Sequence, residues 1–282
     1  MNAIQEIVKG IKNLKPIPMV MHQILDTADN PECSIQDIAR IIQYDPAITA
    51  SVLKTCNSAF FGLKSPAESV KDAVSLLGLD QVVEIVLVSS GASSFSGRQK
   101  GYGMNEGEMW RYAVSSAVIA KQIATFLDME KANMLFTATL LKDIGKIVLD
   151  RFVYESFDKI SSLVVNNNMS FREAEKKVIG VDHTELGAMI AKMWKFSPKM
   201  VKIIRHHHLA DSAFIKDREI SVVFLADGIC MMLGIGSGGD EPDGNANKMA
   251  MKTLALTSDD ISDIVEGFKS QMEKIKTIFT AM

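Results

Sequence analysis

Four of the five histidines are candidate metal ligands, and they are the side chains of this chain best suited to chemistry. His206, His207 and His208 are consecutive in "IIRHHHLAD", and His183 precedes them in "VDHTELGAMIAKMW". Imidazole-rich sites suit zinc, iron, nickel or copper rather than magnesium. A structural role competes with this interpretation, because Asp182 can cap a helix with His183 in its first turn, and histidines at a helix C-terminus are favoured by the helix dipole. Since a metal site needs several converging ligands, the sequence alone favours the structural role.

A charged pair, Lys142-Asp143, interrupts the apolar run "TATLLKDIGKIVLD". Charged side chains in buried segments need a partner. Lys142 could compensate a buried carboxylate if a helix ends near Asp143, and Ile144-Gly145 is consistent with such an end. The alternative is that Lys142 points to solvent and Asp143 only caps a helix, and the sequence leaves both interpretations open.

Other kinds of chemistry have no motif to support them. A Ser, Cys or Asp nucleophile needs a neighbouring base, and the chain shows neither that pattern nor a glycine-rich phosphate loop after a strand. A net charge of −3 with scattered Lys and Arg argues against nucleic-acid binding. The three cysteines are far apart and suggest neither a disulfide framework nor a zinc site. With no apolar stretch long enough for a membrane and no signal peptide, we expect a soluble, cytoplasmic protein that does not bind membranes.

Helical periodicity runs through nearly the whole chain and predicts an all-α fold. Helix starts are indicated by capping-box spacing and by polar residues before a proline. Gly78 indicates a helix end, and Ser258 could cap a C-terminal helix with one apolar face. The predicted starts are Ser34 with Asp37, Ser69 with Asp72, Ser170 with Glu173, Asp45-Pro46 and Ser197-Pro198.

Two polar, glycine-bearing stretches divide the chain. Ser96–Glu108 is either a linker between two helical halves or a long loop within one domain, and Gly234–Lys248 is the most disorder-prone segment. We therefore expect a two-part helical bundle. Residues 1–100 would form an N-terminal subdomain, and residues 101–282 a second subdomain with a flexible loop at 234–248 and a C-terminal helix.

Two stretches carry a resemblance to a known family. "YDPAITASVLKTCNSAFFG" (Tyr44–Gly62) opens with Asp-Pro and ends in Asn-Ser-Ala-Phe-x-Gly, and "VKDAVSLLGLDQV" (Val70–Val82) contains Leu-Gly. This pattern resembles the HDOD family of bacterial signalling proteins over roughly Leu14 to Asp211. That family is related to the HD superfamily of metal-dependent phosphohydrolases, which includes the HD-GYP cyclic-dinucleotide phosphodiesterases. The resemblance implies an HD-domain-like second subdomain and, because HDOD proteins usually lack part of the metal set, no established catalytic activity.

The resemblance also assigns superfamily ligand positions to residues of this chain. The first metal ion would be held at the positions of Tyr112, Lys142, Asp143 and Asp227. Tyr112 is a poor ligand unless deprotonated, and the Lys142 ammonium has no lone pair to offer. The first-metal site is therefore degenerate, and Lys142 could instead supply the charge that Asp143 and Asp227 need.

A second metal ion would be held, by the same resemblance, at the position of His183 and at a His-His pair within the 206–208 cluster, with Asp143 completing the set. The sequence does not decide which two of His206, His207 and His208 correspond. It leaves open one residual site for a divalent transition metal. Its candidate ligands are Asp143, His183, His206, His207, His208 and Asp227.

These features predict a non-catalytic regulatory protein of HDOD type, with no catalytic residue and no required cofactor. It would act through a protein partner and keep a vestigial phosphohydrolase site that could hold a small ligand. The alternatives are a metal-dependent phosphohydrolase acting on a nucleotide or cyclic dinucleotide, and a nucleotide sensor in which Lys142 contacts phosphate.

Overall fold

The computed structural model confirms the all-α fold. It describes residues 6–7, 9–11, 24, 34–43, 45–58, 61–63, 66–95, 97–209, 216–236, 239 and 244–281, without the side chains of residues 35, 47, 90–94 and 273–281. Within these ranges the regular elements are α-helices and one 3-10 turn, and an isolated bridge joins Gln99 and Met104. None of the helices in the described ranges combines the length and apolar composition needed to cross a membrane. Ala59 and Phe60 of the Asn-Ser-Ala-Phe motif lie outside the described residues.

The chain forms two compact units, which are discontinuous in sequence. The large unit contains residues 1–15 and 94–265, and the small unit contains residues 16–93 and 266–282. The predicted subdomains, residues 1–100 and 101–282, are each continuous in sequence. Loop composition can suggest where a chain divides, but it does not reveal which distant segments pack together. The division into these two subdomains stays a prediction.

The small unit contains α3 (Ile35–Gln43), α4 (Pro46–Cys56), α5 (Val70–Leu77), most of α6 (Leu79–Phe95) and, from residue 266 onward, α16 (Ser258–Ala281). Helices α3, α4 and α5 begin directly after the predicted start signals at Ser34, Asp45 and Ser69. Reciprocal hydrogen bonds form the capping boxes of Ser34 with Asp37 and of Ser69 with Asp72. Gly78 ends α5 with a positive φ of 85°, a conformation that costs glycine little.

Asn57 in the HDOD-like motif has a structural role in this unit. Its side-chain amide donates to the carbonyl oxygen of Ala67 at 2.9 Å and accepts from the amide nitrogen of Ala67 at 2.7 Å. These paired bonds fix the connection between α4 and α5. They satisfy backbone groups, which agrees with the structural interpretation of such residues at a helix end.

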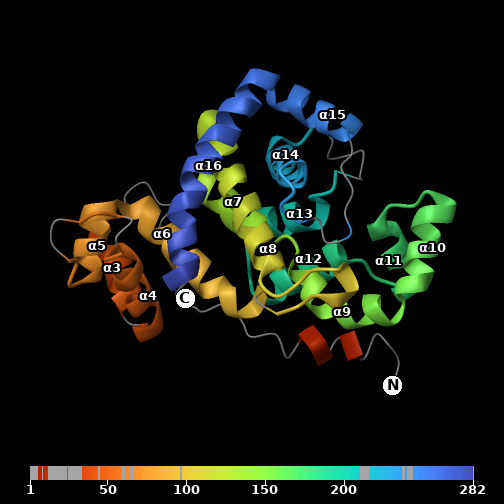
Figure 1. The fold of residues 1–282 in the computed structure, drawn as a ribbon, viewed down its shortest axis with the longest axis horizontal. Coiled ribbons are helices and arrows are strands. Elements are labelled where there is room, and N and C mark those ends of the chain that lie inside the picture. Colours follow the sequence, from red (N-terminus) through yellow and green to blue (C-terminus); the bar gives the residue numbers. More distant parts are fainter. Residues whose placement is uncertain are drawn as a thin grey trace. The chain divides into compact units, whose positions relative to one another are not determined.

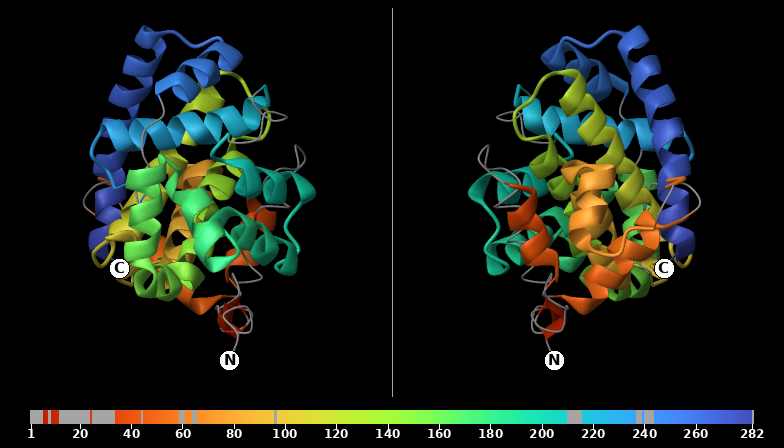
Figure 2. Two further views of the ribbon diagram at one scale, coloured as in Figure 1. Left: turned by 90° about the vertical axis from the view of Figure 1, so that its right-hand side faces the viewer. Right: turned by 90° about the vertical axis from the view of Figure 1, so that its left-hand side faces the viewer.

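The large unit is a bundle around α7 (Glu108–Phe126), which packs against both α8 (Ala132–Leu141) and α14 (Arg218–Met232) (Figure 1). Helix α12 (His183–Met193) packs on α9 (Ile144–Glu155) and α13 (Pro198–His206). Helix α15 (Gly244–Leu254), darker blue in Figure 2, lies against α14, which is light blue. The other elements of this unit are η1 (Lys100–Tyr102), α10 (Phe157–Asn167), α11 (Phe171–Ile179) and the start of α16, residues 258–265.

Three local expectations for the loops and caps need correction or refinement. Of the two alternatives left open for Ser96–Glu108, the long loop within one domain is correct for residues 97–107, since Tyr102 is buried and η1 contacts α9. The predicted loop 234–248 is too long, because residues 244–248 begin α15, whose Ala250 and Leu254 are buried. Thr257 rather than Ser258 caps α16, through reciprocal hydrogen bonds with Asp260.

Candidate functional site

Lys142 and Asp143 lie at the junction of α8 and α9, and both are buried, with exposed fractions of 1% and 2%. Helix α8 ends at Leu141 and α9 begins at Ile144, so the break falls where the sequence indicated it. Glycine is required at the start of α9, because a Cβ on Gly145 would lie 2.0 Å from the carbonyl oxygen of His183. This close approach of α9 to α12 places Asp143 beside His183.

The Lys142 ammonium is held between two carboxylates. It forms an ion pair with Asp143, and it lies 2.8 Å from Oδ1 of Asp227 on α14. The same Asp227 oxygen accepts hydrogen bonds from the Tyr112 hydroxyl at 2.5 Å and from the Ser116 hydroxyl at 3.2 Å, both on α7. Of the two interpretations of Lys142, the buried ion pair is therefore correct and the solvated lysine is wrong.

Charge is retained in this buried group. Burial lowers the pKa of Lys142, but Asp143 and Asp227 outweigh burial and raise that pKa above its usual value. Burial raises the pKa of Asp143, but the neighbouring Lys142 and Lys146 ammonium groups outweigh burial and hold that pKa well below its usual range. Lys142 is thus an ammonium and Asp143 a carboxylate at neutral pH.

Three of the four candidate histidines converge on the other side of Asp143. His183 begins α12, and His207 and His208 follow the last residue of α13. Their potential ligand nitrogens all lie within 4.8 Å of one another. The Nε2 atoms of His183 and His207 each lie 3.8 Å from Oδ1 of Asp143. The fourth, His206, is half-buried and lines a separate groove.

In two of these imidazoles, Nδ1 carries a proton and donates it in a hydrogen bond. His183 Nδ1 donates to Oε2 of Glu175 at 2.6 Å, and His207 Nδ1 donates to the carbonyl oxygen of Ile204 at 2.9 Å. The neutral form of each ring then has its unprotonated Nε2 facing the cluster. In that form His183 Nε2 accepts a hydrogen bond from His208 Nε2, which lies 2.9 Å away.

His207 and His208 are neutral because they are buried. Burial lowers the pKa of His207 to about 3, and burial lowers the pKa of His208 well below its usual value. Neutral imidazole is the form that binds metal ions. His207 Nε2 is buried and has no hydrogen-bond partner in the described part of the chain. An unprotonated, unpartnered nitrogen of this kind fits a transition-metal ligand.

Three residues of the cluster were missed by sequence analysis: Glu175, Tyr102 and Lys146. Glu175 is fully buried and accepts a hydrogen bond from the Tyr102 hydroxyl at 2.5 Å as well as from His183. Lys146 Nζ lies 3.2 Å from Oδ1 of Asp143 and 5.4 Å from the centre of the Tyr102 ring. Glu175 follows Phe171 by four residues, so helical spacing places it on the same face as an aromatic residue, which was the available signal.

The arrangement separates the six candidate ligands into three groups. Asp143, His183, His207 and His208 come together and have donor types that suit zinc, iron, nickel or copper. Asp227 instead belongs to the Lys142 side of the cluster. His206 joins neither group. A divalent ion at the histidines would act as a Lewis acid toward water or a phosphate oxygen.

Comparisons with known proteins show the family through a family model and the fold through solved structures. The family model of the HDOD domain matches residues 14–210. An uncharacterised protein of Treponema pallidum (strain Nichols) is 26% identical over 203 residues, which cover 70% of this chain and 38% of that protein. The chain thus spans well under half the length of that curated relative.

Two solved structures share the fold over nearly the whole chain. An HDOD domain protein of unknown function from Geobacter sulfurreducens has a TM-score of 0.74 at 24% identity, covering 99% of this chain and 96% of that one. A suggested phosphohydrolase from Shewanella amazonensis SB2B has a TM-score of 0.70 at 20% identity, covering 98% and 97%. The model match extends over most of the chain, and this chain therefore belongs to the HDOD domain family.

Proposed function

We propose that this protein is a non-catalytic regulatory protein that acts through a protein partner. The observation that supports this most strongly is the Lys142 ammonium between Asp143 and Asp227. Those are the positions from which the resemblance to metal-dependent phosphohydrolases would draw carboxylate ligands. An ammonium carries charge there but cannot coordinate an ion, polarise a water or take up phosphate charge as a Lewis acid.

The nucleotide-sensor alternative is weakened by the same geometry. Lys142 is 1% exposed and its ammonium already contacts two carboxylates. Lys146, the second buried cation, lies against Asp143. Neither lysine presents a charge to an incoming phosphate without first leaving a carboxylate, and breaking a buried pair from one side costs about 3–5 kcal/mol.

The histidine side supports a second, narrower proposal: one divalent transition-metal ion bound by His183, His207 and His208 beside Asp143. The unpartnered Nε2 of His207 favours it. Glu175 would orient His183 in the way that carboxylates orient metal-bound histidines. His208 must release its Nε2 proton before that atom can bind an ion. Such an ion would be structural or regulatory in a non-catalytic protein, and it is also the requirement of the phosphohydrolase alternative.

An activity assay tests the absence of catalysis. Protein purified without a histidine tag should show no turnover of cyclic di-GMP, dGTP or a generic phosphoester when manganese, iron or nickel is supplied. The non-catalytic proposal fails if turnover occurs and disappears in both Asp143→Asn and His183→Ala. Asparagine is chosen because it keeps the shape of the carboxylate.

Partner capture tests the binding role. Tyr154 and Phe157 at the α9–α10 junction expose 58% and 46% of their surfaces, so this region offers apolar side chains to a partner. A partner captured from the native host should be retained by His207→Ala and lost with Tyr154→Lys and Phe157→Lys combined. Loss in His207→Ala alone would place recognition at the vestigial site instead.

A further inference from the structure

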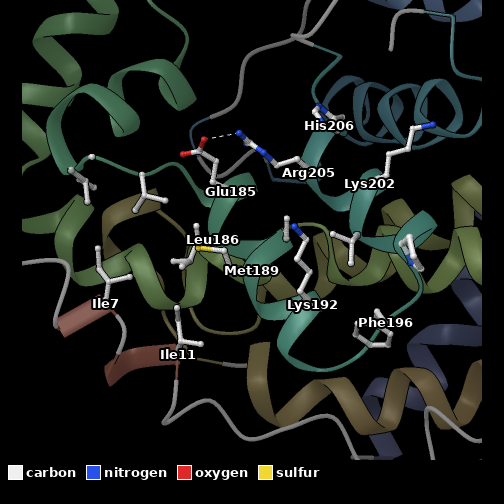
Figure 3. A pocket seen from close by; sticks show the side chains of 16 residues that line it. Ile7, Ile11, Glu185, Leu186, Met189, Lys192, Phe196, Lys202, Arg205 and His206 are labelled. Atoms are coloured by element: carbon white, nitrogen blue, oxygen red, sulfur yellow. Dashed lines mark hydrogen bonds and ion pairs between the residues drawn. The ribbon is translucent and has the colours of Figure 1, made fainter. Parts of the chain in front are cut away.

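A groove of about 780 Å³ lies between Ile7 and Ile11 near the N-terminus, the end of α11, and helices α12 and α13 (Figure 3). It is separate from the histidine cluster, although His206 lines it. Its lining is mainly apolar, and it falls within the range of small-molecule sites, about 300–1,000 Å³. The apolar side chains include Ile7, Ile11, Leu186, Met189, Phe196 and Val201.

Positive charge gathers around this apolar lining. Lys192, Lys202 and Arg205 line the groove, and Glu185 is the acidic residue that lines it with them. Glu185 is already compensated twice, by Arg205 at 2.6 Å and by Lys176 at 2.7 Å. The groove therefore carries an excess of cations over an apolar surface, which complements an anion with an apolar body.

Lys192 is the cation best placed to receive an anionic group. Arg205 is engaged by Glu185 and donates to the Thr184 hydroxyl at 2.9 Å, and Lys202 is engaged by Asp217. Lys192 is exposed and has no ion-pair partner among the residues that the structure describes. Its side chain extends across the middle of the groove in Figure 3.

We propose that this groove binds a small amphipathic anion with a single alkyl chain and a carboxylate head. The alkyl chain would lie on Leu186, Met189 and Phe196, where burial of apolar surface supplies the binding free energy. The carboxylate would pair with Lys192. A small molecule suits the site better than a folded partner, because Ile7 and Ile11 already cover one side of the groove, with Ile7 only 5% exposed.

Calorimetric titration with dodecanoate below its micelle concentration tests the proposal. The full chain should bind dodecanoate, and it should bind hexanoate and dodecyltrimethylammonium much more weakly. Phe196 packs near Trp194, with ring centres 6.4 Å apart, so tryptophan fluorescence should change on binding. A dodecyl chain with either head group binding equally well would show plain apolar association and would overturn the proposal.

Two surface variants separate the head from the tail. Lys192→Glu should weaken dodecanoate binding about fivefold, and Met189→Glu should weaken it about tenfold. Their matched controls are Lys177→Glu and Met193→Glu, which are exposed positions outside the lining and should bind as the parent does. All four positions are exposed, so the variants should fold, which an unchanged thermal midpoint would verify.

Several outcomes would overturn this assignment. Unchanged affinity in both Lys192→Glu and Met189→Glu would place dodecanoate elsewhere. Binding of an acidic amphipathic peptide without binding of dodecanoate would make the groove a peptide site. A dimer in sedimentation experiments that Met189→Glu abolishes would make the occupant a second copy of this chain.

Discussion

The two groups of buried polar side chains beside Asp143 differ in how their atoms find partners. One group contains Lys142 and Asp227, and the other contains the histidines. On the Lys142 side, Asp227 accepts hydrogen bonds from Tyr112 and Ser116 and pairs with the Lys142 ammonium, so its partners all come from the chain. On the histidine side, His207 Nε2 is buried without a hydrogen-bond partner. One side is closed by the protein's own cation, whereas the other keeps nitrogens of the type that bind metal.

This difference shows that two buried carboxylates can be compensated by a lysine of the chain. A lysine supplies positive charge but no ligand atom. The histidine side has imidazoles rather than an ammonium near Asp143. Lys146 is the exception there, since it lies 3.2 Å from Oδ1 of Asp143 and would share that oxygen with a bound ion.

The largest effect is expected from Lys142→Met, which keeps much of the stem and removes the charge. It leaves Asp143 and Asp227 facing each other in a buried site, so the free energy of unfolding should fall by about 3–5 kcal/mol at neutral pH. Thermal and urea unfolding would measure the loss. Lys177→Met, at an exposed position of α11, is the control and should change stability little.

The pH dependence of that loss follows from the direction of the two pKa shifts. Because the pKa of Asp143 is lowered in the folded state, Asp143 stabilises the fold above about pH 4, and this contribution is lost as pH falls. Because the pKa of Lys142 is raised in the folded state, Lys142 stabilises the fold below about pH 10, and this contribution is lost as pH rises. The deficit of Lys142→Met should therefore be largest between these values and shrink in acid, although Lys146, His183 and His207 also face Asp143. A variant as stable as the parent at pH 7 would mean that Lys142 does not replace an ion.

Zinc binding tests the histidine side. If the ion binds only the folded state, zinc at about a hundred times its dissociation constant should stabilise the protein by about 2.7 kcal/mol. His207→Ala should abolish the shift, and His206→Ala should retain it, because His206 lies outside the cluster. An equal shift in both variants would indicate surface binding and would refute the proposed ligand set.

Local signals in the sequence were sufficient for much of the fold. The capping boxes at Ser34, Ser69 and Ser170 formed as predicted, because each depends on residues three positions apart. The sequence left open whether the stretch around Tyr102 is a linker or a loop within one domain, because the burial of Tyr102 depends on α9, far away in the chain.

The candidate site was predictable only as a set of residue types. The place of Lys142 between two acids followed from a family resemblance, and the structure supplied the contacts. The choice of His207 and His208 over His206 depends on where α13 ends, since the side chains of consecutive residues point in different directions. Glu175 was missed because a glutamate in a polar helix is ordinarily exposed, and only the fold places His183 against it.

Glu175→Gln tests whether Glu175 supports metal binding on the histidine side by orienting the His183 ring. The glutamine keeps the size of the side chain but holds the His183 ring with a weaker, uncharged acceptor. Metal affinity should fall by about tenfold, toward the lower end of the effects of such supporting residues. Competition with a chelating indicator would measure it, and Glu155→Gln on the exposed end of α9 is the control. Affinity equal to the parent would limit Glu175 to a packing role.

The smallest effect is expected from Ser116→Ala on the closed side. The Ser116 hydroxyl donates to Asp227 at 3.2 Å, while Asp227 keeps Lys142 and Tyr112, so the loss should be about 1 kcal/mol rather than the larger cost of an unpaired charge.

Ser221→Ala is a matched control on α14, since the Ser221 hydroxyl is equally buried but has no hydrogen-bond partner among the described residues. Removing an unpaired hydroxyl should leave stability unchanged or raise it, because no bond is lost and a buried polar group is removed. Urea unfolding of both variants at pH 7 therefore measures the Asp227 hydrogen bond by difference. If the two variants lose the same free energy, Ser116 contributes only packing, and the closure around Asp227 rests on Lys142 and Tyr112 alone.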